Sequence, residues 1–200
     1  MEMAKIDNVA LRVNIGRNSK IKSVALSLAE AKLGKEKSNL LEDFNSHPVT
    51  KEIDGGATSS NISGTLGGYG NLFSFIGFVD GSNPTQIVRD LISKIRLIRS
   101  SSKVSADSSG SVFSFRVSAS SIDVFKKNTP MPWAIGRSWL IGIEYGISGF
   151  GSFINKALAA SRSGGGIQAD GKVRDSSFRR TSYFQNIYST FFNRISRRKA

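Results

Sequence analysis

The clearest alternation of apolar and polar positions lies in residues 136–154. In the first half of this stretch every second residue is large and apolar, namely Trp139, Ile141, Ile143, Tyr145 and Ile147. A period of two is typical of a β-strand that buries one face, so the pattern predicts a core strand. Gly149, Phe150 and Gly151 follow, and the glycines permit a sharp bend. We expect Phe150, at this bend, to contact another subunit.

Similar alternation or apolar clustering predicts further strands over residues 9–15, 72–78 and 112–117. Helical spacing predicts one helix over 19–34, capped by Ser19, and a second over 35–46. The two segments also fit a single kinked helix. In either case the helix ends at His47, because a residue before proline, here Pro48, disfavours helical backbone.

Asn83 and Pro84 mark the start of the most regular helix, with Asn83 as cap and Pro84 at the first helical position. Its apolar stripe runs from Ile87 to Ile98. Residues 51–70 and 100–110 are rich in glycine or serine, and we expect a long loop and a flexible connection there. A helical turn is expected from Ser120 or Ser121 to residue 125, followed by an extended linker over 126–133.

The last thirty residues differ in composition from the rest of the chain. Residues 171–200 hold eight basic residues and one acid. Seven apolar residues recur there at helical spacing, which predicts an amphipathic helix: Tyr183, Phe184, Ile187, Tyr188, Phe191, Phe192 and Ile195. We therefore divide the chain into a single α+β domain (1–170) and a basic aromatic C-terminal arm (171–200). The expected fold is a small antiparallel or mixed sheet packed by two or three helices, with long Gly/Ser loops and this C-terminal amphipathic helical arm.

Charge and composition restrict the classes of function. The chain has 28 Lys+Arg against 15 Asp+Glu, a net charge of +13, which favours an acidic partner such as nucleic acid, an anionic membrane surface or an acidic protein. It contains no cysteine and one histidine, which excludes disulfides, thiolate metal sites and multi-histidine metal sites. With no recognisable secretion signal and no long apolar run, we expect a soluble intracellular protein.

Candidate catalytic groups are few. His47 follows Asp43 by one helical turn, but a histidine at a helix end more often interacts with the helix dipole than catalyses. Glu144 lies within the apolar stretch and is expected at a surface, paired with an arginine. The glycines of residues 64–70 precede a predicted strand, whereas a phosphate-binding loop precedes a helix. We therefore predict no catalytic, cofactor-binding or metal-binding residue, no cofactor, and a protein that is not an enzyme.

The basic aromatic arm fits either of two partners. Its arginines can neutralise the phosphates of a nucleic acid while its aromatic rings stack on bases. Alternatively, its aromatic face buries against a neighbouring subunit. The regular helical spacing favours docking. The predicted interface residues are Phe150, Tyr69, Tyr183, Phe184, Tyr188, Phe191, Phe192, Arg194, Arg197 and Arg198.

Several blocks, FNSHPVTKEI, SGTLGGYGNLFSFIGF, SWLIGIEYGISGFGSFI and SRSGGGIQ, resemble virion structural proteins of tailed, contractile-tail bacteriophages, of the neck or tail-completion type. The resemblance covers roughly residues 44–168. It implies a non-enzymatic subunit of a ring at the neck or tail terminus, located in the virion and assembled in the host cytoplasm. Its partners would be copies of itself and neighbouring portal, neck, tube or sheath proteins, close to genome DNA and without a membrane. A basic nucleic-acid-binding protein that uses the C-terminal arginines remains the alternative.

Overall fold

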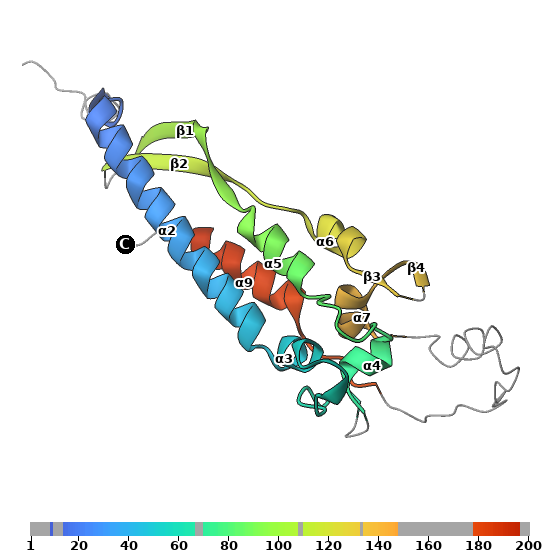
Figure 1. The fold of residues 1–200 in the computed structure, drawn as a ribbon. Helices are drawn as coiled ribbons and strands as arrows, with labels where there is room; N and C mark the ends of the chain where they lie inside the picture. Colours follow the sequence, from blue (N-terminus) through green and yellow to red (C-terminus); the bar gives the residue numbers. More distant parts are fainter. Residues whose placement is uncertain are drawn as a thin grey trace, which may run out of the picture.

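The computed structural model describes residues 9, 14–66, 70–107, 110–132, 134–147 and 178–196. These residues form an elongated body of mixed helices and strands, which confirms the α+β class (Figure 1). The long helix α2 (Ser19–Ser46) and the C-terminal helix α9 (Phe184–Ser196) lie side by side along it. A β-hairpin accompanies the N-terminal part of α2, and short helices gather at the opposite end.

Helix α2 is continuous, so the single-helix alternative is correct. Asn18, not Ser19, is its N-cap, since the Asn18 side chain accepts a hydrogen bond from the backbone N–H of Lys20 at 3.0 Å. The helix passes through Gly34, where the sequence pattern favours a boundary, and ends before His47 as predicted. The predicted strand over 9–15 is wrong where it is described, because Val9 and residues 14–15 are helical.

Residues 51–70 are less open than expected, because a helix occupies the start of this stretch. Pro48 opens α3 (Pro48–Asp54), and the 3-10 turn η1 (Gly56–Thr58) follows. Proline suits the first turn of a helix, where its missing N–H has no intrahelical partner. The irregular part of this segment therefore begins at Ser59.

The strand predicted over 72–78 is instead the helix α4 (Leu72–Ile76). Asn71 caps its start by accepting a hydrogen bond from the Ser74 N–H at 2.9 Å. Gly77 ends it with a left-handed backbone of φ 83°, and its N–H bonds to carbonyls of the last turn. Glycine adopts this conformation without a steric penalty, so polar caps and not apolar alternation decide the local structure.

Helix α5 (Gln86–Ser93) confirms a helix after Pro84, but it is shorter than the stripe suggests and its N-cap is Thr85. Ile98 lies in the strand β1 (Arg96–Asp107), which also replaces the flexible connection expected over 100–110. Strand β2 (Gly110–Ser118) confirms the strand predicted near 112–117. The two strands pair antiparallel, from Arg96 opposite Ser118 to Asp107 opposite Gly110. A serine-rich segment becomes a strand here because a partner strand and α2 lie beside it.

The strand predicted from Trp139 is also wrong, because Trp139–Tyr145 is the helix α7. Its N-cap Ser138 accepts a hydrogen bond from the Ile141 N–H at 3.3 Å. Helix α6 (Ile122–Asn128) precedes it, with two short strands, β3 (Pro130–Met131) and β4 (Ala134–Ser138), between them. The Gly149–Phe150–Gly151 bend lies outside the described residues.

Helix α9 confirms the predicted amphipathic helix, and its aromatic face joins the core of the same body. The Phe184 ring lies 4.5 Å from that of Phe125, centroid to centroid, and 6.0 Å from that of Phe44 on α2. Tyr188 is buried as well and donates its hydroxyl to the Ser120 carbonyl at 2.6 Å. The described C-terminal residues 178–196 are thus part of the domain core. The largest fully buried side chains are Trp139, Tyr183, Phe44, Phe73, Phe125, Phe184, Phe191, Leu40, Ile53, Leu72, Ile76 and Ile92.

Candidate functional site

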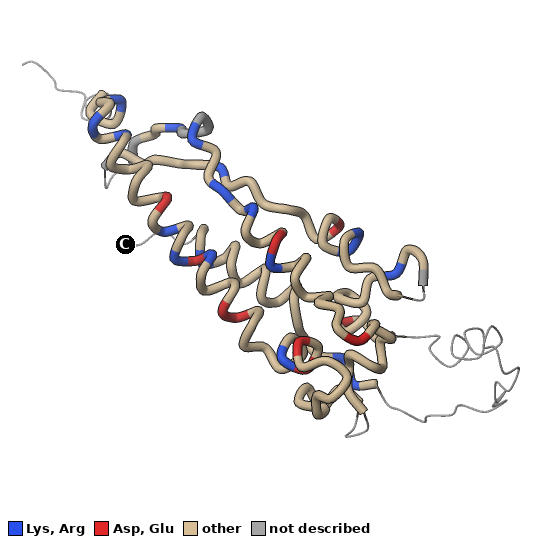
Figure 2. The backbone as a smooth tube through the Cα atoms, in the orientation of Figure 1, with Lys and Arg blue, Asp and Glu red and all other residues tan. Residues whose placement is uncertain are grey.

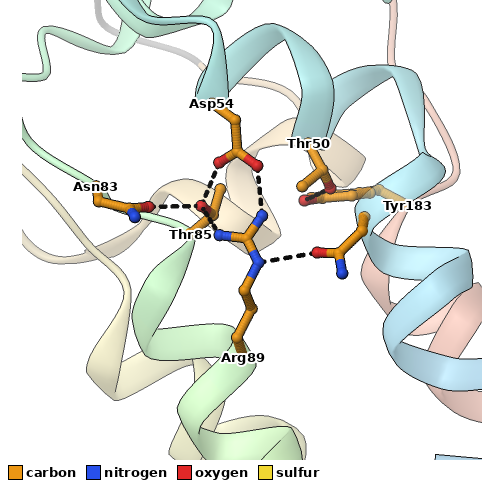
Figure 3. Close-up of polar contacts among 7 residues, drawn as sticks. Thr50, Asp54, Asn83, Thr85, Arg89 and Tyr183 are labelled. Carbon is orange, nitrogen blue, oxygen red and sulfur yellow. Dashed lines mark hydrogen bonds and ion pairs between the residues drawn. The ribbon is translucent and has the colours of Figure 1, made fainter. Parts of the chain in front are cut away.

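The densest polar cluster joins α2, α3 and α5 around the Arg89 guanidinium (Figure 3). One terminal nitrogen of Arg89 pairs with Asp54, and the other donates to the Thr85 hydroxyl at 2.7 Å. Its Nε donates to the Asn45 side-chain oxygen at 2.8 Å, and the Thr85 hydroxyl donates to Asp54. The guanidinium also lies over the Phe44 ring, 5.7 Å from the centroid.

This cluster stabilises the packing of the three helices against one another. A guanidinium that engages a carboxylate, a hydroxyl and an amide at once is fixed in position, because each of its nitrogens already has a partner. The Thr85 hydroxyl is buried and held by Asp54, so it is not presented to a substrate. Asn83, which the sequence suggests as a helix cap, lies 3.0 Å from that hydroxyl through its side-chain oxygen.

Thr50 and Tyr183 form a second buried polar contact next to this cluster, with the half-buried His47 beside it. The Tyr183 hydroxyl lies 2.7 Å from that of Thr50, and the His47 ring packs against the Tyr183 ring at 4.8 Å. Nδ1 of His47 accepts from the Val49 N–H at 3.3 Å, so His47 caps α3 as well as ending α2. Burial lowers the pKa of His47, against a smaller opposing effect of a backbone hydrogen bond to Ser182. Burial likewise raises the pKa of Tyr183, which keeps its hydroxyl neutral.

Glu144 was expected at a surface beside an arginine, and the structure corrects this. The carboxylate is half-buried and caps the start of α9, accepting from the N–H groups of Tyr183 at 3.2 Å and Gln185 at 2.7 Å. Burial raises the pKa of Glu144, and the two backbone hydrogen bonds partly offset this. A negative charge at a helix N-terminus is stabilised by the helix dipole, so Glu144 acts as an anchor for α9.

The sequence gives no indication of the role of Glu52, which is 0% exposed on α3. Its two carboxylate oxygens accept from the backbone N–H groups of Ser63 and Leu72, each at 2.7 Å. These partners lie 11 and 20 residues further along the chain, so no local motif could reveal them. By binding these two N–H groups, Glu52 holds the irregular segment between η1 and α4 in contact with the core.

The predicted interface residues of α9 divide into buried and surface groups. Tyr183, Phe184, Tyr188 and Phe191 are buried within their own chain, so in this structure their rings form core contacts and not a docking face. The reason is that α2 and α6 supply apolar partners on that side, including Phe44 and Phe125. Phe192 remains 37% exposed. Arg194 forms an ion pair with Asp43 at 2.8 Å. The Asp43 carboxylate therefore faces Arg194 and does not support the acid–base pair with His47 considered from the sequence. Tyr69, Phe150, Arg197 and Arg198 lie outside the described residues.

Two unlike surfaces remain at opposite ends of the body (Figure 1). On the first half of α2, Ile21, Val24 and Leu28 are exposed to 38%, 59% and 67%. At the far end a groove of about 380 Å³ lies between the start of α5 and α7. Most of its lining is apolar or proline: Phe78, Val79, Ser82, Asn83, Pro84, Ile87, Asn128, Pro130, Pro132 and Trp139.

The described residues contain no group of three or more His, Asp or Glu side chains placed to hold a metal ion. Among the described helices, none combines the length and the apolar character needed to cross a membrane. Comparison of the chain with protein-family models, with curated proteins and with solved structures finds no match.

Proposed function

We propose that this chain is a non-enzymatic structural subunit that forms a ring at the neck or tail terminus of a tailed-phage virion. Two observations support the proposal. The sequence blocks within residues 44–168 resemble virion structural proteins, and the two ends of the body carry unlike surfaces suited to contact each other. The unlike surfaces support the formation of a ring, and the sequence resemblance indicates the particle in which the ring acts.

The N-terminal end of α2 exposes an apolar stripe that could insert into an apolar groove. Ile21, Val24 and Leu28 recur at intervals of three and four residues, so they lie along one face of the helix. Two exposed lysines flank the first residue of this stripe: Lys20 comes just before Ile21 and Lys22 just after it. An exposed apolar helix face favours association with another apolar surface.

The groove at the opposite end of the body has an apolar lining that can receive such a stripe. Its apolar lining includes Val79, which is 75% exposed. Exposed charged residues lie close by in the chain: Asp80 follows Val79, Asp90 lies one helical turn after the groove residue Ile87, and Lys127 precedes the groove residue Asn128. The two carboxylates can pair with lysines of an incoming α2 end. We therefore commit to one occupant for this groove, the basic, apolar α2 end of a second copy of this chain.

Contacts between two different patches on identical subunits are head-to-tail. Such contacts generate a closed ring when the rotation between neighbours closes, and an open filament when it does not. Opposite charges beside the apolar patches steer the encounter and set its orientation. The ring would then contact neighbouring virion proteins, with basic surface available towards genome DNA.

The ring is tested with substitutions at each end of the body. Val24→Asp/Leu28→Asp places charges on the α2 stripe, and Val79→Asp places one in the groove. Ser27→Asp, also exposed on α2 but outside the stripe, is the matched control. By light scattering and negative-stain electron microscopy we expect rings from the unaltered chain and from the control. Each end variant alone should be a monomer that still melts cooperatively, with a melting temperature that no longer depends on protein concentration.

Mixing the two end variants tests the head-to-tail geometry. Each variant retains one intact end, so a mixture should form a heterodimer through a single native contact. A symmetric contact between identical patches would give no heterodimer. An unaltered chain that stays a dispersed monomer, together with its absence from virions by mass spectrometry, would refute the proposal.

A further inference from the structure

A second groove, distinct from the apolar one, lies where α5 passes into β1. It has a volume of about 600 Å³ and is lined by Lys37, Ser93, Lys94, Ile95, Arg96, Ser118, Ala119 and Ser120. A further depression of about 360 Å³ shares Lys37, Ile95 and Arg96 with it and extends between α2 and β1 as far as Arg99. The two depressions adjoin along the seam between α2 and the hairpin, since both are lined by Lys37, Ile95 and Arg96, and together they are called the channel below.

The charge of this channel is predominantly positive. It is lined by four cations, Lys37, Lys94, Arg96 and Arg99, and one carboxylate, Glu30. That carboxylate is engaged by Arg99 at 2.7 Å. Blue basic positions accordingly mark α2 and the α5–β1 junction in Figure 2. Among the described residues, neither Lys94 nor Arg96 forms an ion pair with an acid.

Regular structure fixes the backbone positions from which these cations extend. The Lys37 ammonium donates to the carbonyls of Ser93 at 3.0 Å and Ile95 at 3.4 Å, which holds it at the end of α5. Lys94 is the C-cap of α5, and Arg96 is the first residue of β1, opposite Ser118. The cations are thus presented from a helix end and a paired strand, with serines beside them.

We propose that this channel binds the phosphate backbone of a nucleic acid. An arginine fork, lysine ammonium groups and serine hydroxyls together match the charge and the hydrogen-bond acceptors of phosphate. An acidic protein segment fits less well, because a protein interface needs an apolar centre. The apolar lining residues are Leu33, Ile95, Leu97 and Ala119, and they offer little of one, since Leu33 and Ile95 are only 7% and 3% exposed. This site differs from the C-terminal arginines that the sequence suggests, and it does not depend on the ring.

Binding of a fluorescein-labelled DNA duplex of random sequence, followed by anisotropy at several salt concentrations, tests the proposal. Lys94→Ala/Arg96→Ala removes two phosphate contacts, so the slope of log K against log salt should become shallower by about two. Lys126→Ala/Lys127→Ala on α6 removes the same charge from exposed positions outside the channel and should leave the slope unchanged.

A second variant keeps the cations in place. Ser118→Glu introduces a carboxylate opposite Arg96 and should weaken duplex binding without removing any basic residue. Melting curves establish that each variant is folded. Equal effects of the channel and α6 variants would overturn the site, because binding would then follow net charge alone. Displacement of the duplex by polyglutamate as readily as by unlabelled DNA would overturn the assignment to nucleic acid in favour of an acidic protein.

Discussion

Replacing Glu52 by glutamine tests whether one buried carboxylate holds the segment between η1 and α4. In the native protein the two carboxylate oxygens each accept one backbone N–H, from Ser63 and from Leu72. Glutamine has nearly the same shape but only one acceptor oxygen. Its amide group must therefore point its own N–H groups at one of these two donors.

The size of the effect follows from these contacts. A hydrogen bond to a charged group contributes about 1.5–3 kcal/mol, and a buried donor left without an acceptor costs about 1–3 kcal/mol. Both effects fall on the same N–H and overlap, so we expect Glu52→Gln to lower the free energy of unfolding by about 2–4 kcal/mol. Glu42→Gln, at an exposed position on α2, makes the same chemical change and should shift it by less than about 0.5 kcal/mol.

Urea denaturation followed by tryptophan fluorescence measures the loss, since Trp139 is buried in the core. Hydrogen exchange adds a local measurement, because the Ser63 or Leu72 amide should exchange faster in Glu52→Gln than in the unaltered protein. A variant with the same unfolding midpoint as Glu42→Gln, and with both amides still protected, would refute the reasoning.

Three further changes test other contacts. Phe184→Ala removes a ring buried between Phe44 and Phe125, and urea denaturation should show a loss of about 3–5 kcal/mol. Asp43→Ala breaks the half-exposed pair with Arg194 and should cost less than about 1 kcal/mol in the same assay, and a larger loss would contradict a surface role. Because burial lowers the pKa of His47, the unfolded chain binds its proton more readily, and this contribution to stability is present above about pH 6.5 and lost as pH falls below it. His47→Asn keeps a helix-capping side chain and should flatten that part of the stability–pH profile, which unfolding at a series of pH values measures.

The sequence pattern predicts those elements in which apolar spacing and packing agree. Helix α9 is one, because its stripe of rings faces the core. The pattern fails for Trp139–Tyr145, where the buried residues Trp139, Leu140 and Ile143 follow helical spacing and Ser138 supplies the N-cap. Tyr145, which belongs to the alternating set, is 60% exposed. The strand prediction for Leu72–Ile76 fails for the same reason, and here Asn71 is the N-cap. A polar residue just before an apolar run was the available signal in both cases.

The polar contacts could be predicted far less well than the helices. Glu52 and Glu144 bind backbone groups 11 to 41 residues away in the sequence, and only the assembled fold brings these together. The channel residues Lys37 and Arg96 come from α2 and β1. The serine-rich sequence of β1 does not predict a strand. The groove and the channel thus depend on tertiary packing that spacing along the chain does not encode, whereas the α2 stripe follows from helical spacing.

The position of α9 has a consequence for the order in which the protein is made. Phe44 on α2 is covered by rings of α9, and the contact between Thr50 and Tyr183 joins residues 133 positions apart in the sequence. During synthesis the part of α2 that packs against α9 therefore stays uncovered until the C-terminal helix has left the ribosome. Truncated chains that lack α9 would keep that part of α2 exposed to proteases and chaperones, because the core is complete only once α9 has packed.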